Sequence, residues 1–277
     1  MEMTMRITHI LTFLIALVLG AGSARALAQG SVDAACSDNV VPLETPGNDK
    51  EQRDVLLKQA NACLHAGKTP RAIALLSQII RSNPADAETY VNRGTLQASI
   101  GEVPLALSDF TAAIRLQPDL VEAWYNRGTT LTHMRRFESA IADFTEVIRL
   151  KPDFALAYCN RGLANFELGR YDDALVDYSV AIDQDSKRTY CYFNRGTFYL
   201  TIGQYQKAID DFTQALGERQ SEPTALSRRG QAHEALGQLS QALDDFRAAL
   251  NADPKLESAR EGFARITEEQ KRSDVGK

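Results

Sequence analysis

Apolar side chains recur three and four residues apart along most of this chain, in two stretches per repeating unit, and each unit is thirty-four positions long. Such spacing places them on one face of an α-helix and argues against strands. The pattern runs through six consecutive units, which span 53–86, 87–120, 121–154, 155–188, 189–222 and 223–256. A period of this length is typical of a solenoid, in which each unit packs against its neighbours. We therefore predict an all-α solenoid of six helix-turn-helix units.

At three positions of the unit, the side chain has a similar size in all six units. The eighth position is always small: Ala60, Gly94, Gly128, Gly162, Gly196 and Gly230. The twentieth position is always alanine: Ala72, Ala106, Ala140, Ala174, Ala208 and Ala242. Small residues at both positions let the two helices of a unit approach closely. Large side chains at the twenty-fourth position are expected to fill the gap between neighbouring units: Leu76, Phe110, Phe144, Tyr178, Phe212 and Phe246.

Turn residues separate the predicted helices. Glycine follows the first helix of five units, with Arg135 as the exception: Gly67, Gly101, Gly169, Gly203 and Gly237. Proline stops the second helix of four units, because it cannot continue a helix: Pro84, Pro118, Pro152 and Pro254. Ser186 and Gln220 take the place of proline in the fourth and fifth units.

An arginine stands at the seventh position of five units, and an aspartate follows each one sixteen residues later. The pairs are Arg93 with Asp109, Arg127 with Asp143, Arg161 with Asp177, Arg195 with Asp211, and Arg229 with Asp245. The first unit lacks both residues and has Gln59 and Leu75 instead. Because the two residue types appear and disappear together, we predict structural ion pairs between helices, where a planar guanidinium suits a carboxylate. A catalytic group repeated five times is a poorer explanation.

These positions together resemble the tetratricopeptide repeat family, most clearly at Trp124, Gly128, Ala140, Phe144 and Pro152. The resemblance covers 204 of the 277 residues, and its weakest match is the first unit, with Leu56 and Ala60. It implies a right-handed superhelical solenoid that binds a protein or peptide partner on its concave face.

The resemblance also places the sixth residue of each first helix in the concave groove. The residues that we expect to contact a partner there are Asn92, Tyr125, Asn126, His133, Asn160, Tyr190, Phe193, Asn194 and Arg228. Amide side chains can hydrogen-bond to a peptide backbone, and aromatic rings add apolar contact. Some family members clamp a carboxylate here with basic and asparagine side chains. Asn194 and Arg228 match two of those places, but the other places hold Cys159, Leu163 and Thr224, so that clamp is mostly absent.

The amino-terminal segment has the pattern of a signal peptide. Arg6 precedes an apolar run over 10–19, and Ala26-Leu27-Ala28 supplies small residues before a cut after Ala28. This run is shorter than the roughly 20 residues that a membrane span needs, so no stable membrane insertion is expected after cleavage. The expected location is the periplasm.

The segments that flank the repeats have different roles. Residues 29–52 contain Pro42, Pro46 and Gly47 and are interpreted as a flexible lead-in. In 257–272, Ala259, Phe263 and Ile266 fall on one helix face, as a helix that caps the last repeat requires, and 273–277 form a tail.

Four cysteines follow the predicted cleavage point, and an oxidising compartment permits two disulfides among them. Cys36 with Cys63 is slightly favoured, because such a bridge would tie the lead-in to the weakest repeat. Cys159 and Cys191 lie on first helices of neighbouring units, where a disulfide and two buried thiols are both acceptable.

Composition and the remaining motifs argue against other functions. The net charge of -5 and pI near 5.5 disfavour a nucleic-acid partner. His65 and His133 are two units apart, which excludes a shared metal, and "HEALG" at 233 ends in Gly237 where a zinc protease needs histidine. We expect no metal, no cofactor and no enzymatic activity.

The sequence therefore predicts a non-catalytic scaffold or adaptor of the bacterial cell envelope that binds a protein or peptide in its concave groove. One alternative is a scaffold of an exopolysaccharide or protein export system, with Tyr125, Tyr190 and Phe193 stacking on a polymer. A second alternative is an enzyme. The fold alone does not decide the partner or the oligomeric state.

Overall fold

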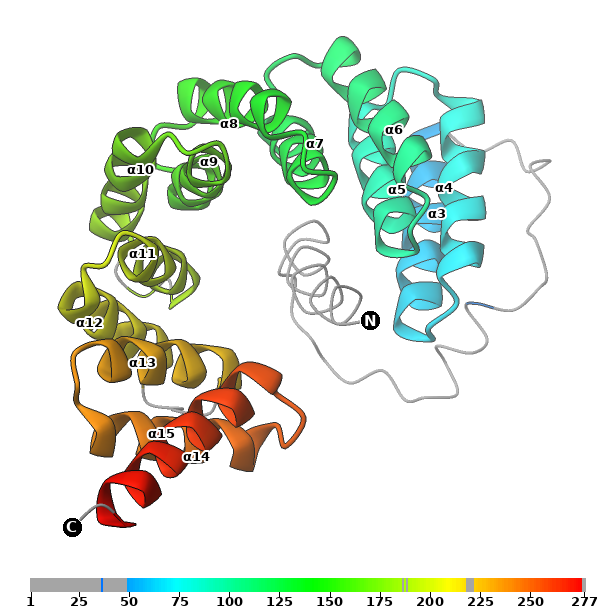
Figure 1. The fold of residues 1–277 in the computed structure, drawn as a ribbon. Coiled ribbons are helices and arrows are strands. Elements are labelled where there is room, and N and C mark those ends of the chain that lie inside the picture. The colour runs from blue at the N-terminus through cyan, green and yellow to red at the C-terminus, as the bar shows by residue number, and fades with distance from the viewer. Residues whose placement is uncertain (1–35, 37–48, 186, 188, 218–221, 276–277) are drawn as a thin grey trace. The chain divides into compact units, whose positions relative to one another are not determined.

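The structure is a computed structural model that describes residue 36 and residues 49–185, 187, 189–217 and 222–275 (Figure 1). All regular secondary structure in these residues is helical. In chain order the helices are α3 (Asp49–His65), α4 (Thr69–Ser82), α5 (Ala87–Ser99), α6 (Val103–Leu116), α7 (Val121–His133), α8 (Phe137–Leu150), α9 (Ala155–Glu167), α10 (Tyr171–Gln184), α11 (Thr189–Thr201), α12 (Tyr205–Leu216), α13 (Pro223–Ala235), α14 (Leu239–Ala252) and α15 (Glu257–Val275). The predicted all-α repeat solenoid is confirmed.

The helix boundaries follow the sequence period. From α5 onward, every first helix begins one repeat length after the preceding one, and every second helix from α4 onward does the same. The turn after the first helix has a positive φ in all six repeats, and five of these residues are glycines. Arg135, with φ 58°, is the one non-glycine residue at this place. Glycine adopts this backbone conformation without the steric cost that a Cβ brings.

Two helix boundaries differ from the predicted ones. Helix α3 begins at Asp49, inside the predicted lead-in, because Asp49 to Gln52 contain no helix breaker and continue directly into the first repeat. Helix α15 continues to Val275, beyond the predicted end at 272, because the first glycine after it is Gly276. The predicted signal peptide, its cleavage point and most of the lead-in lie outside the described residues.

The chain divides into two compact units, residues 1–146 and 147–277. In each unit successive helices pack in pairs, as Figure 1 shows for α5 with α6 and for α11 with α12. In the second unit, α15 packs on α13 and α14, and its Ala259 and Ile266 are fully buried in the same apolar cluster as Phe246.

The small eighth position and the large twenty-fourth position meet inside each repeat. A Cβ added to Gly94 would lie 2.9 Å from Cε1 of Phe110, and one added to Gly128 would lie 2.9 Å from Cε1 of Phe144. Both rings are buried. Phe246 would also meet a Cβ at Gly262 of α15, so this ring lies between its own repeat and the next helix. In each of these repeats the aromatic ring fills the space that a side chain at the glycine position would occupy.

The five repeated arginines each bind the aspartate sixteen residues later through two hydrogen bonds. In every pair Nε donates to Oδ2 and Nη2 donates to Oδ1, over 2.6 to 2.9 Å. The aspartate side chains are 4–8% exposed and the arginine side chains 17–22%. Hydrogen bonding to the aspartate raises the pKa of Arg93, Arg161 and Arg195, although burial opposes it.

The guanidinium groups make two further contacts beyond the predicted ion pairs. The aromatic residue three positions earlier covers the guanidinium at 5.0 to 5.8 Å in four repeats: Tyr90, Trp124, Tyr158 and Tyr192. Nη1 of Arg93 donates to Ser77 Oγ of the preceding repeat over 3.0 Å, and Arg127 and Arg229 make the same contact with Thr111 and Thr213. Each of these three arginines therefore joins its own helix pair to the preceding repeat.

The arginine pair gives a first testable prediction. Arg93→Leu leaves the Asp109 carboxylate buried without its partner, so we expect a loss of roughly 3 kcal/mol in the free energy of unfolding. Arg93→Leu with Asp109→Leu should lose much less, because no buried charge remains uncompensated. Urea unfolding measures both variants, with Ser77→Ala as the control for the third contact. Equal destabilisation of the single and double variants would contradict the pairing.

The glycine and the ring give a second prediction. The first repeat has Ala60 and Leu76 where the second has Gly94 and Phe110. We expect Gly94→Ala to destabilise the protein by about 1 to 3 kcal/mol through overpacking. Adding Phe110→Leu should recover part of this loss, because it restores the combination of the first repeat. Strict additivity of the two single losses would show that the residues do not interact.

Candidate functional site

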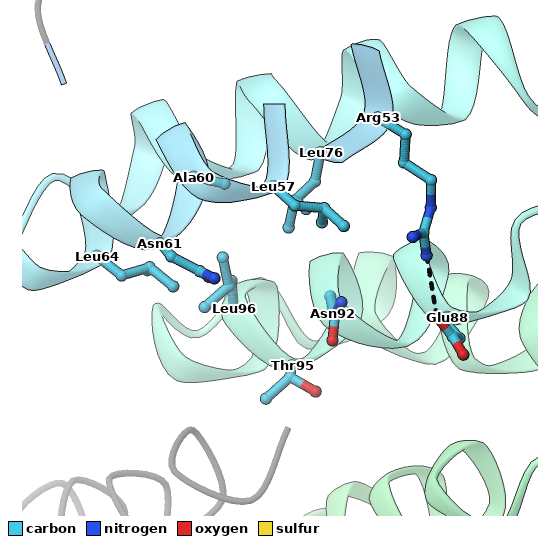
Figure 2. Close-up of a pocket in the computed structure, with 10 residues that line it drawn as sticks. All are labelled: Arg53, Leu57, Ala60, Asn61, Leu64, Leu76, Glu88, Asn92, Thr95 and Leu96. Atoms are coloured by element: carbon cyan, nitrogen blue, oxygen red, sulfur yellow. Dashed lines mark hydrogen bonds and ion pairs between the residues drawn. The ribbon is translucent and has the colours of Figure 1, made fainter. Parts of the chain in front are cut away.

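The structure contains a pocket between α3 and α5 in the first unit, here called the α3–α5 pocket (Figure 2). Its volume is about 220 Å³. The lining residues are Arg53, Leu57, Ala60, Asn61, Leu64, Leu76, Glu88, Asn92, Thr95 and Leu96. Leu57, Asn61 and Leu64 are spaced four and three residues apart on α3, and Glu88, Asn92 and Thr95 repeat this spacing on α5. Each set therefore lies on one helix face.

The floor and rim of the pocket differ in chemistry. Leucine and alanine side chains from α3, α4 and α5 form an apolar floor, while Asn61 and Asn92 add an amide from each side (Figure 2). Arg53 and Glu88 form the charged end, where Arg53 Nη2 donates to Glu88 Oε2 over 2.9 Å. The arrangement suits an apolar side chain whose flanking backbone needs hydrogen bonds.

The amide groups of Asn61 and Asn92 are available for hydrogen bonds to a ligand. Neither Asn61 nor Asn92 forms a side-chain hydrogen bond with the residues that the structure describes. The other asparagines at the sixth position are buried, and two of them contact the preceding first helix. Asn126 Nδ2 donates to Thr95 Oγ1 over 3.2 Å, and Asn194 Nδ2 lies 3.8 Å from Cys159 Sγ. Among the asparagines at the sixth position that the structure describes, Asn92 is the one that lines the α3–α5 pocket.

An ion pair specific to the first repeat shapes the pocket. This repeat lacks the arginine and aspartate of the others, but Arg53 Nε donates to Asp86 and Nη2 to Glu88. Asp86 also caps α5, because its carboxylate accepts from Thr89 N over 3.1 Å and from Thr89 Oγ1 over 2.8 Å. Burial alone would raise the pKa of Asp86, but the hydrogen bonds from Arg53 and Thr89 hold it below its usual range. Arg53 and Asp86 thus fix α3 against the start of α5.

Both cysteine pairs are bonded in the structure. Cys36 is joined to Cys63 of α3, with 5.0 Å between their Cα atoms, and both are buried against Leu56, Leu75 and Leu76. Cys159 of α9 is joined to Cys191 of α11, with 5.6 Å between their Cα atoms. The first bridge ties Cys36 to the helix that carries Leu57, Asn61 and Leu64.

The other residues expected in the groove are not gathered into one pocket. Tyr125 is buried with its ring 6.0 Å from Phe144. Phe193 is half-buried, 5.9 Å from the Phe212 ring, and the Arg228 guanidinium lies 6.0 Å above it. His133 is exposed at the end of α7, Asn160 is buried, and Tyr190 is half-buried with its pKa raised by burial.

Sequence reasoning missed most of the pocket. Of the residues expected in the groove, Asn92 alone lines the pocket, and Arg53, Leu57, Asn61 and Leu64 belong to the first repeat, which matches the repeat pattern worst. The spacing of Leu57, Asn61 and Leu64 on one face of a predicted helix was the available signal.

The described residues contain no group of three or more histidine, cysteine, aspartate or glutamate side chains that could hold a metal ion. No helix in the described part of the chain is both long and apolar enough to cross a membrane.

Comparison with known proteins agrees with this architecture. Two models described as tetratricopeptide repeat match the sequence, one over residues 121–154 and the other over 57–120 and 193–257. These segments cover more than half of the chain, so the protein belongs to the tetratricopeptide repeat family. Proteins of this repeat type serve as protein-interaction scaffolds. No curated protein matches the sequence significantly.

Solved structures share the fold at low sequence identity. A tetratricopeptide repeat protein from Parabacteroides merdae is 18% identical with a TM-score of 0.66, over 81% of this chain and 89% of its own. PilW, described as a widely conserved type IV pilus biogenesis factor, is 16% identical with a TM-score of 0.68, over 76% and 97%. YrrB, described as having an unusual peptide-binding site, is 20% identical with a TM-score of 0.54, over 67% and 96%.

The Asp86 contacts predict how acid affects the first repeat. A carboxyl group whose pKa is lower in the folded protein stabilises it above the unfolded pKa of about 3.9, and this stabilisation is lost as the pH falls through the folded pKa. Asp86→Asn removes the charge but keeps a residue that can cap α5. We expect this variant to be about 1 to 3 kcal/mol less stable than wild type at pH 7. The difference should shrink below pH 4 in denaturant titrations, and a constant difference across pH would contradict the assignment.

Proposed function

We propose that this protein is a non-catalytic adaptor that binds an extended segment of a protein partner along its first helices, with the α3–α5 pocket as the anchoring site. The observation that carries this proposal is the pair of uncommitted amides, Asn61 and Asn92, above an apolar floor. An amide can donate to a backbone carbonyl and accept from a backbone N–H at the same time. Two amides on opposite walls can therefore hold a backbone while its side chain enters the pocket.

The size of the pocket matches one side chain. A volume of about 220 Å³ holds a leucine, isoleucine, methionine or phenylalanine side chain, and burying one contributes about 1.5 to 3 kcal/mol. Because Arg53 and the Cys36–Cys63 bridge hold α3 in place, little ordering is required of the protein. Preorganisation of this kind leaves more of the contact energy for affinity.

We further propose that the adaptor acts in the bacterial cell envelope. The sequence pattern of residues 1–28 supports export, and two disulfides are the expected state of cysteines in an oxidising compartment. The fold is shared with PilW, which is described as a type IV pilus biogenesis factor, and this supports the proposal. An export-system scaffold that contacts a polymer is the alternative, and glycan binding by the purified protein would favour it.

Site-specific crosslinking in the native host tests the proposal. A photoreactive residue at Leu64, which lines the pocket, should capture a discrete protein that is absent when the same residue replaces Leu105, an exposed leucine of α6. Asn92→Leu or Leu57→Asp should reduce this capture at least several-fold, because each removes an interaction proposed to hold the segment. Capture that persists in both variants, or that is equal from Leu105, would contradict binding in the pocket.

A further inference from the structure

Carboxylates stand at the second position of the first three repeats. Asp54, Glu88 and Glu122 occupy this equivalent position, with Glu88 and Glu122 in the first turns of α5 and α7 and Asp54 in the second turn of α3. All three are exposed, and all three belong to the first unit. The fourth to sixth repeats have Leu156, Tyr190 and Thr224 at this position. The row therefore runs along the part of the chain that contains the α3–α5 pocket.

Nearby cations neutralise this row only in part. Arg53 binds Glu88, but its Nε is committed to the buried Asp86, and it also lies 3.9 Å from Asp54. Lys58 is one helical turn after Asp54 and is exposed. Glu88 keeps 66% of its side chain exposed despite its bond to Arg53, and Glu122 has no described partner. The excess negative charge therefore lies at Glu88 and Glu122.

We propose that the partner segment is cationic, with lysine or arginine close to the apolar residue that enters the α3–α5 pocket. This inference rests on the proposed function and adds the chemical class of the ligand. Glu88 lines the pocket itself, so a cation bound there is next to the anchor side chain. An acidic segment would meet like charge at the same place, which disfavours binding.

The repeat spacing sets the spacing of the cations. Neighbouring packed helices are about 8 to 10 Å apart, and an extended peptide advances about 3.3 Å per residue. Glu88 and Glu122 lie on α5 and α7, which pack against each other, so they face positions about three residues apart along the segment. The expected motif has an apolar residue with lysine or arginine about two to three residues away.

A purely structural role for these carboxylates is the competing explanation. Glu88 and Glu122 lie in the first turns of α5 and α7, where negative charge complements the helix dipole. That role affects stability and does not select a ligand. Asp172 and Asp173 occupy the first turn of α10 in the second unit and are also exposed, so they provide a matched control for charge removal.

Selection from a random peptide library displayed on phage, with the purified protein as bait, tests the inference. We expect enriched peptides to carry lysine or arginine two to three residues from an apolar residue. Glu88→Gln and Glu122→Gln should each weaken an enriched peptide about twofold to fivefold at 0.15 M salt, the range of exposed ion pairs. Asp172→Asn with Asp173→Asn should leave its affinity unchanged.

The outcomes separate this inference from the proposed function. Peptides that lose binding with Leu57→Asp but show no cationic preference would overturn the inference and leave the pocket proposal intact. Peptides that bind equally well to Leu57→Asp, or no enrichment at all, would overturn both. If the α10 control weakened peptide binding equally, the effect would come from the net charge of the protein. That result would overturn the inference that the local carboxylate row selects the ligand.

Discussion

The bidentate bond between arginine and aspartate is the interaction on which the repeat depends. Both partners are largely removed from water, so neither can be lost alone without leaving a costly charge. An aromatic ring on the same helix covers the guanidinium, and the hydroxyl of the preceding repeat extends the bond to a third helix. It therefore fixes both the pairing of helices inside a repeat and the register between repeats.

The first repeat departs from this scheme, and its departure creates the pocket. Without the arginine and aspartate, α3 is held by Arg53 with Asp86 and by the bridge from Cys36 to Cys63. These contacts lie near the start of α3 and near its end, so Leu57 and Asn61 between them stay available. In the regular repeats, first helices such as α5 and α7 pack against each other. In the first repeat, the ion pair and the disulfide hold α3 instead, so the face of α3 that carries Leu57 and Asn61 lines a pocket.

The fold could be predicted because it depends on positions that recur. The repeat pattern shows Gly94 with Phe110 and Arg93 with Asp109 as residue types that recur from one repeat to the next. The family pattern then predicts that the two residues of each pair are in contact. The hydroxyls of Ser77, Thr111 and Thr213 also recur at one repeat position, so their contacts are predictable in the same way. The pocket could not be found this way, since it arises where the repeat is broken and depends on which asparagine is left without a partner. Asn92 and Asn126 occupy the same position, but only Asn126 donates to Thr95.

Hydrogen–deuterium exchange of the protein with and without a bound partner segment tests the account most directly. The account predicts slower exchange on α3 around residues 57–64, on α5 around residues 88–96 and on the first turn of α7 near Glu122, with the second helices unchanged. Protection that falls mainly on α4 and α6, or on the second unit, would show that the partner binds elsewhere.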